Sequence, residues 1–340
     1  MKTSLIASTA LLALIPLGAV AQDRTLTISV YAFAQDDFKT LVYDPFEKQC
    51  GCKLVVETGN SVERLAKMEA NKANPVVDMA VVSMADALSA SRKGLVEKID
   101  PSKLTNFGKL YDLAKDPNGD GMSVGYTFYA TSIAYRSDKM KIEFLGRSPQ
   151  AGICGPRRLS ERDHQPGAAG ALYARPRARQ GYARPQGTDR SRRRKKDDIV
   201  TFYEKSSQLI QLMQQEEIWA APIGRFSWAG FTKLDLPVAW ATPKEGQTGG
   251  MNVMVVTKGS KNQDLALQFM DFWLSTDIQT KLAEKLIDSP ANKDVKVSEA
   301  AANNLTYGED TAKSLKLIPS AAALDNRDAW LKEWNDKVGQ

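Results

Sequence analysis

The chain has 340 residues, enough for two domains of ordinary size, and its formal net charge is +6. Such a charge invites a nucleic-acid partner, but most of it lies in one segment, so the sequence argues against a basic nucleic-acid-binding protein. Cysteines are few, and Cys50-Gly51-Cys52 has neither the spacing nor the second thiol pair of a zinc site. In an oxidising compartment Cys50 and Cys52 could close a small disulfide ring, or they could stay an idle pair in a turn.

The first 21 residues predict export. Lys2 precedes an apolar run over residues 5–20, which is too short and too interrupted by Pro16 and Gly18 to cross a membrane comfortably. The run ends in Ala-Val-Ala, the small-residue pattern that signal peptidase cleaves. We therefore expect a signal peptide over residues 1–21 and a soluble mature chain that begins at Gln22.

Strand and helix patterns alternate from residue 25 onward. The strand segments are short and rich in β-branched residues, whereas the helix segments carry apolar residues at helical spacing. Pro45 should shorten or kink the first helix, and Ser61 is placed to cap the second. The predicted elements are strand 25–33, helix 37–49, strand 53–57, a helix from Ser61, strand 76–83 and helix 85–93. This order indicates a mainly parallel sheet covered by helices.

The stretch from Gly125 to Arg136 is rich in aromatic and β-branched residues, which predicts a strand. Because strand and helix signals begin again after it, we interpret it as the first crossing between two lobes. A strand buried in a single core would show the same pattern. The later predicted elements are helix 206–217, strands 218–223, 238–241 and 251–257, and helices 263–274 and 276–286.

Two further segments carry specific expectations. Asp116 to Gly121 copies the first half of a calcium loop, but Thr127 stands where that loop needs a bidentate Glu, so an ordinary turn is the preferred interpretation. We expect no metal and no cofactor. The C-terminal segment 325–337 is expected to bury its large apolar side chains, Trp330, Leu331 and Trp334.

The segment from Arg147 to Arg194 differs from the rest of the chain. It holds twelve arginines, no lysine and only three acidic residues, a net charge of +9, which leaves −3 for the remainder of the chain. It also contains the only histidine, His164. A disordered basic arm that binds an anionic partner is one interpretation. We prefer a translational frameshift. The residues after Glu143 can be assigned codons such that, when one base after the Glu143 codon is removed, the shifted frame encodes an ordinary protein sequence. The original frame would return near Lys195.

The mature chain outside that segment resembles the periplasmic solute-binding proteins of ABC transporters, of the spermidine/putrescine-binding type. The resemblance is carried by the order and spacing of several stretches, namely residues 55–69, 77–83, 93–104, 124–134 and 243–251. It implies a type II periplasmic binding fold of two α/β lobes joined by crossing strands. Lobe I would take residues 22–129 and about 251–340, and lobe II residues 130–250, with 147–194 anomalous.

The resemblance also implies a function. Such proteins capture a small polar solute between the lobes, close on a hinge and deliver the solute to permease subunits in the inner membrane. We expect a periplasmic monomer that is not an enzyme and binds no nucleic acid. The ligand-contacting positions carried over from the family are Phe33, Ser83, Phe128, Arg225, Phe226 and Asn252. Phe33 and Phe128 could equally belong to a core, Ser83 could cap a helix, and Arg225 could be a surface charge.

The candidate site departs from the polyamine pattern. Gly224-Arg225-Phe226-Ser227 stands where the family places an acid, and Asn252 stands where it often has Asp. Arg225 would instead favour a ligand with a carboxylate or phosphonate group. The rival hypotheses are a secreted hydrolase that uses carboxylates and a non-functional frameshifted product. The hydrolase has little support because the sequence lacks the Gly-x-Ser-x-Gly and His-Glu-x-x-His motifs.

Overall fold

The computed structural model describes residues 24–140, 200–201, 203, 206–242 and 246–337. The predicted anomalous segment and the signal peptide therefore lie outside the described residues. In the first part of the chain the elements are β1 (Thr25–Val30), α1 (Gln35–Phe38), η1 (Lys39–Tyr43), α2 (Asp44–Cys50), β2 (Lys53–Thr58), α3 (Ser61–Ala70), β3 (Met79–Ser83), α4 (Met84–Arg92), η2 (Pro101–Lys103), η3 (Phe107–Lys109), α5 (Asp112–Lys115) and β4 (Val124–Arg136).

The second part of the chain adds four strands and the helices around them. These elements are α7 (Ser206–Gln214), β5 (Ala220–Gly224), η7 (Arg225–Ser227), α8 (Trp228–Thr232), β6 (Val238–Trp240), β7 (Thr248–Val256), α9 (Gln263–Trp273), α10 (Thr276–Glu284), α11 (Glu299–Ala302), α12 (Glu309–Ser314), β8 (Lys316–Leu317) and α13 (Ser320–Lys337). None of the described helices is long and apolar enough to span a membrane.

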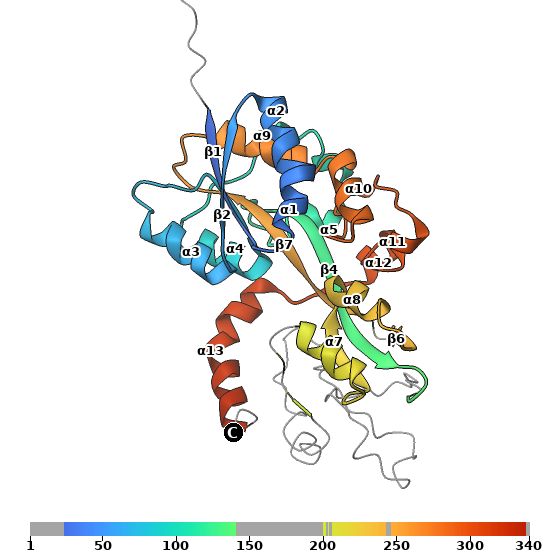
Figure 1. The fold of residues 1–340 in the computed structure, drawn as a ribbon. Coiled ribbons are helices and arrows are strands. Elements are labelled where there is room, and N and C mark those ends of the chain that lie inside the picture. Colours follow the sequence, from blue (N-terminus) through green and yellow to red (C-terminus); the bar gives the residue numbers. More distant parts are fainter. Residues whose placement is uncertain (1–23, 141–199, 202, 204–205, 243–245, 338–340) are drawn as a thin grey trace, which may run out of the picture.

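The strands follow the order β2-β1-β3-β7-β4-β5, with β6 paired to β4 and β8 paired to β7. β1 is parallel to both β2 and β3, as the alternating pattern predicts, whereas β7 returns antiparallel to β3. In Figure 1 the β1–β3 side with its helices forms the upper part of the molecule, and α7, α8 and β6 lie at the other end of β4.

β4 joins the two parts of the molecule. Its first residues, from Val124 to Thr131, pair with β7, and the residues from Thr131 to Arg136 pair with β5 and β6. The β4–β7 register shifts beside Gly125, where a side-chain Cβ would clash with the sulfur of Met251. The prediction of a crossing strand over these residues is confirmed.

The two largest hydrophobic cores among the described residues lie on either side of this crossing. The first is built around β1, β3 and β7 and includes an aromatic group in which Phe269 packs on Phe46 and on Trp273, with ring centroids 4.8 and 5.5 Å apart. The second is much smaller and comprises Ala134, Leu209, Met213, Ile218, Ala221, Ile223, Trp228 and Phe231. We call them the first core and the second core, and they mark lobe I and lobe II of the α/β fold.

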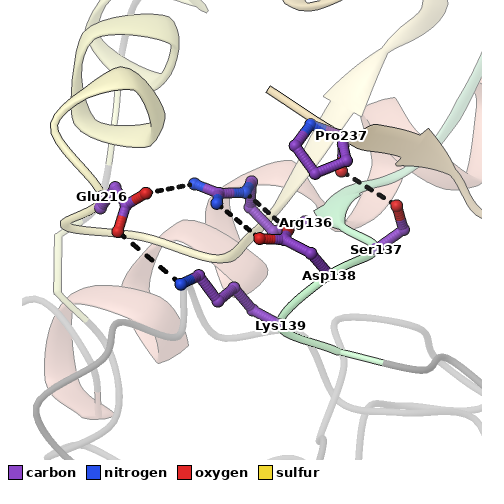
Figure 2. A network of polar contacts seen from close by, with 6 residues as sticks. All are labelled: Arg136, Ser137, Asp138, Lys139, Glu216 and Pro237. Atoms are coloured by element: carbon purple, nitrogen blue, oxygen red, sulfur yellow. Dashed lines mark hydrogen bonds and ion pairs between the residues drawn. The ribbon is translucent and has the colours of Figure 1, made fainter. Parts of the chain in front are cut away.

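A charged network closes the far end of β4, as Figure 2 shows. Arg136 is 2 % exposed, and its guanidinium donates to both carboxylate oxygens of Asp138, at 2.8 and 2.7 Å, and to Glu216 at 3.1 Å. Lys139 lies 3.9 Å from the other oxygen of Glu216. These bonds link the end of β4 to the turn after α7, so a buried arginine keeps its charge through partners that reach the surface.

Several local expectations are corrected by the structure. The cap of α3 is Asn60 rather than Ser61, because the Asn60 side chain accepts from the N–H of Glu63 while the Glu63 carboxylate accepts from the N–H of Asn60. The burial predicted for the C-terminal segment is wrong for Trp330 and Leu331, which are 37 % and 56 % exposed on α13. Trp334 is half-buried.

Two alternatives that the sequence leaves open are decided by local geometry. Cys50 and Cys52 form a disulfide in the turn between α2 and β2. In the calcium-like segment the Asp116 carboxylate accepts from the N–H of Gly121 at 3.1 Å, which closes an ordinary turn. Among the described residues no group of three or more His, Cys, Asp or Glu side chains is placed to hold a metal ion.

Candidate functional site

Four polar residues meet where β1 and β3 end in lobe I. Tyr31 follows β1, Ser83 is the last residue of β3, and Asn252 is directly opposite Ser83 in the antiparallel β3–β7 pair. The Tyr31 hydroxyl is 2.8 Å from Oγ of Ser61, at the start of α3, and it donates to Oδ1 of Asn252 at 3.4 Å. Parallel strands place their carboxyl ends at one edge of a sheet, which is where α/β proteins usually bind ligands.

Arg64 contacts Tyr31 and Ser61 of this group and is 3 % exposed. Its guanidinium carbon stands 4.0 Å from the centre of the Tyr31 ring, and its nitrogens donate to the carbonyl of Gly59 at 2.5 Å and to Oγ of Ser61 at 3.3 Å. Burial lowers the pKa of Arg64, while nearby Tyr31 opposes that shift. The buried Arg64 guanidinium therefore packs on one face of the Tyr31 ring and stabilises its position.

Ser83 is also a helix cap. Its Oγ accepts from the N–H of Asp86 at 3.1 Å and lies 2.8 Å from Oδ2 of the same residue, at the start of α4. Its own N–H donates to Oγ of Ser61 at 3.3 Å. The capping role that the sequence leaves open is thus real, and it fixes the hydroxyl at the edge of the polar group.

Asp288 adds a carboxylate on the side of β4. It follows α10. Burial raises its pKa to about 7, although a hydrogen bond from Thr127 of β4 lowers the pKa in part. The residue keeps some exposed surface, but its Oδ2 is enclosed and has no hydrogen-bond partner among the described residues. Tyr126, the neighbour of Thr127, lies near both Asp288 and Asn252, so this carboxylate borders the polar group.

Arg225 and Phe226 come from lobe II, in the 3-10 turn that follows β5. The Arg225 guanidinium carbon stands 4.6 Å from the ring centre of Trp240 and 5.3 Å from that of Trp228, and it donates to the carbonyl of Asn303 beyond α11. Burial lowers the pKa of Arg225 to about 10, so it is still charged at neutral pH. Its Nε is enclosed without a partner among the described residues.

The aromatic positions carried over from the family fall in different environments. Phe226 is 59 % exposed and meets the Tyr129 ring edge-on with centroids 5.1 Å apart. Phe33 is 60 % exposed in the loop after β1. Phe128 is 1 % exposed in the first core and packs edge-on against Tyr111, so its ring offers no surface to a ligand in this conformation.

The structure therefore brings Ser83 and Asn252 together, places Phe33 at the same end of β1 as Tyr31, and holds Arg225 and Phe226 on the lobe II side. The sequence analysis did not identify four members of the site, which are Tyr31, Ser61 as a site residue, Arg64 and Asp288. Tyr31 could have been found, because it lies near the carboxyl end of the predicted strand 25–33, where ligands bind. Arg64 and Asp288 become significant only through burial, which a single sequence does not show.

Comparisons with known proteins give a consistent result. The family model described as bacterial extracellular solute-binding protein matches residues 42–150 and 190–307. A putrescine/cadaverine-binding protein of Pseudomonas aeruginosa is 27% identical over 305 residues, covering 81% of this chain and 83% of that protein. The spermidine/putrescine-binding periplasmic protein of Escherichia coli is 24% identical, covering 92% and 91%.

Solved structures agree on the fold. The crystal structure of an ABC transporter protein from Clostridium perfringens matches with a TM-score of 0.71 and 26% identity, covering 92% of this chain and 99% of that one. A spermidine/putrescine ABC transporter substrate-binding protein from Streptococcus pneumoniae matches with a TM-score of 0.67 and 16% identity, covering 91% and 98%. Two lobes around a crossing strand are thus the common architecture.

Proposed function

The chain belongs to the family of bacterial extracellular solute-binding proteins, and we propose that it is the periplasmic substrate-binding component of an ABC importer. It captures one small polar solute and delivers it to permease subunits in the inner membrane, acting as a monomer without catalysis. The single observation that carries this proposal is the polar group of Tyr31, Ser83 and Asn252 at the ligand-binding edge of the lobe I sheet.

The ligand of this proposal lies between the lobes. Lobe I takes residues 22–129 and about 251–340, and lobe II takes residues 130–250. Phe33, Ser83 and Asn252 contact the ligand from lobe I, and Arg225 and Phe226 contact it from lobe II, with Phe128 joining only if β4 moves. A ligand that touches both lobes only when they are closed stabilises the closed state, which the permease then recognises.

The ligand class we propose is a small aliphatic compound with a primary ammonium group. The relatives described above, a putrescine/cadaverine-binding protein and a spermidine/putrescine-binding protein, support an amine. The aromatic surfaces of Phe33, Tyr31 and Phe226 also suit a cation with an aliphatic chain. Arg225 supports a second candidate, an amino acid whose carboxylate pairs with its guanidinium at the expense of the Asn303 carbonyl.

Calorimetry tests the class directly. The mature chain is titrated with 1,4-diaminobutane, spermidine and 4-aminobutanoate, a set that separates a second ammonium from a carboxylate on the same chain length. Tight 1:1 binding of a diamine supports the amine, and a preference for 4-aminobutanoate supports the amino acid. Turnover of a compound with a hydrolysable bond, such as an N-acylated diamine, would instead revive the hydrolase, because a binding protein returns its ligand unchanged.

An Arg225→Ala variant refines the result. Loss of a charge-assisted pair in a water-poor site costs about 2–5 kcal/mol of binding free energy. We expect that loss for 4-aminobutanoate and little change for 1,4-diaminobutane. Unchanged affinity for both ligands would remove Arg225 from the site and leave it as a contact between β5 and the α11 region.

The reading frame over 147–194 is part of the same proposal. The match to the family model is interrupted between residues 150 and 190, so this segment is foreign to the family, as either a frameshift or a basic arm would make it. Resequencing the DNA across codons 143–196 is the test. A confirmed frame would favour the basic arm, and an altered frame would give the chain on which ligand binding should be measured.

A further inference from the structure

Asp288 is held in place by the chain around it. The side chain of Gln279, on α10, donates to the carbonyl of Tyr126 at 2.9 Å and accepts from the N–H groups of Ala291 and Asn292 at 2.8 and 3.1 Å. Pro290 forms a bridge with Thr127 of β4. The segment carrying Asp288 is therefore anchored on both sides, and its carboxylate cannot turn out to solvent without breaking buried hydrogen bonds.

Among the described residues, no cation contributes to the pKa of the Asp288 carboxylate. The influences on its pKa are burial and the hydrogen bond from Thr127. In the described part of the chain, the charge of Asp288 helps to raise the pKa of two phenols, those of Tyr126 on β4 and Tyr43 in η1. Arg64 of α3 influences Tyr126 but has its own partners in Tyr31, Ser61 and Gly59.

A buried carboxylate with an enclosed, unpartnered oxygen is costly, and each such group in a native protein needs an explanation. Tyr126 and Tyr43 beside it are buried, whereas Tyr31 is half-buried. The Tyr31 hydroxyl donates to Asn252, which pairs with Thr127 in the β4–β7 register. Carboxylate plus aromatic rings is the combination that recognises an ammonium group. Asn252, which is neutral, cannot provide that charge itself.

We propose that Asp288 is the carboxylate that binds the ligand's primary ammonium group, and that it decides the preference of this site for amines. This inference rests on the proposed function and goes beyond it, because it names the residue that supplies the negative charge. A diamine and an amino acid both carry a primary ammonium group, so the experiment below uses one probe of each kind to tell which ligand class provides it.

The proton balance of the step is simple. In the free protein the carboxyl is partly protonated near neutral pH, since burial raises its pKa to about 7. The arriving ammonium stabilises the carboxylate, so the carboxyl proton leaves for solvent and the ligand keeps all its own protons. Binding therefore releases about half a proton at pH 7, and affinity is about tenfold weaker at pH 6 than at pH 8.

The experiment is calorimetry of the mature chain, in the frame that resequencing gives, with 1,4-diaminobutane and 4-aminobutanoate in two buffers of different ionisation enthalpy. Asp288→Asn keeps the shape of the side chain, and Asp294→Asn is the matched control because Asp294 is exposed on the same segment. We expect Asp288→Asn to weaken diamine binding by about thirtyfold or more and to abolish both proton release and the pH dependence. Asp294→Asn should change none of these.

The outcomes separate the two proposals. Equal diamine affinity and equal proton release in wild type and Asp288→Asn overturn the role of Asp288 and leave the solute-binding function intact. If the wild type binds neither amine, both the amine function and this role are overturned. If only 4-aminobutanoate binds and Asp288→Asn weakens it, Asp288 still binds the ammonium and the source is an amino acid.

Discussion

The first core and the second core differ in what encloses them. In the first core, the aromatic rings of Phe269, Trp273 and Phe46 interlock beneath a sheet that is covered by helices, and stability there rests on apolar packing. The second core has eight buried residues, and a buried arginine with carboxylate partners lies at its edge. Among the described residues the second core therefore has fewer apolar contacts, so the polar network at its edge should matter more to its stability.

Matched phenylalanine deletions should separate the two cores most strongly. Phe269 and Phe231 are both 0 % exposed, one in each core. Phe269→Ala should lower the free energy of unfolding by about 4–5 kcal/mol, and Phe231→Ala by about 3 kcal/mol, because fewer rings surround the second cavity. Urea denaturation followed by circular dichroism measures both. A larger loss for Phe231→Ala would reverse the comparison.

Asp288 has an enclosed carboxylate oxygen without a partner among the described residues, and its effect on stability depends on pH. Its pKa is about 7 in the folded protein and near 4 for an unfolded carboxyl. The folded state thus holds the proton more tightly, so this group causes stability to fall as pH rises from about 4 to 7. Asp288→Asn should remove that fall and raise stability at pH 8 by about 2–4 kcal/mol. Identical pH profiles for variant and wild type would show that the carboxyl is not enclosed.

Arg136 tests the polar side of the comparison. Arg136→Met should cost about 2 kcal/mol, because it removes a buried donor from Asp138 and Glu216, both of which can turn to water. The exposed Arg92–Asp325 pair is the control, and Arg92→Met should change stability by less than about 0.5 kcal/mol. The same denaturation series measures both variants.

The same network predicts a loss of folding stability at acid pH, which we call the acid limb of the stability profile. The hydrogen bond from Arg136 lowers the pKa of Asp138 below its usual range. That stabilisation is present above the ordinary carboxyl pKa and is lost as pH falls through the lowered folded value, below about pH 4. Arg136→Met should therefore be less sensitive to acid than the wild type, and an unchanged acid limb would contradict the assignment.

The smallest expected effect separates a cap from a ligand contact. Ser83 caps α4 and Ser275 caps α10 in the same way. Ser83→Ala and Ser275→Ala should each cost about 1 kcal/mol of stability. Only Ser83→Ala should also weaken ligand binding, so a calorimetric titration that finds equal affinities would leave Ser83 as a cap alone.

The sequence predicts local features of this fold well. The alternation of β-branched residues identified β1, β2 and β3, and the aromatic stretch identified β4 as the crossing strand. It fails where burial depends on distant contacts. Trp330 and Leu331 have an apolar pattern that predicts burial, but α13 projects with both side chains exposed. Local periodicity reports which side chains could share a face, and it does not report whether a partner covers that face.

The candidate site shows the same limit. Ser83 and Asn252 are far apart in sequence and become neighbours through the antiparallel β3–β7 pair, so only the family resemblance could place them together. Asp288 gives no signal in the sequence, because its enclosure depends on Thr127, Tyr126 and the Gln279 hydrogen bonds. Position in a family pattern can be read from sequence, whereas electrostatic environment has to be read from structure.

The central claim is that one solute is held between lobe I and lobe II, and the diamine affinity of Phe226→Ala tests it most directly. Phe226 is exposed on lobe II, where its ring meets Tyr129 edge-on and covers Gly224, so its removal should change stability little. We predict that calorimetry finds 1,4-diaminobutane binding weakened by about tenfold, the loss of one cation–aromatic contact. Wild-type affinity in Phe226→Ala, together with a loss in Asn252→Ala, would place the ligand on lobe I alone and contradict the account.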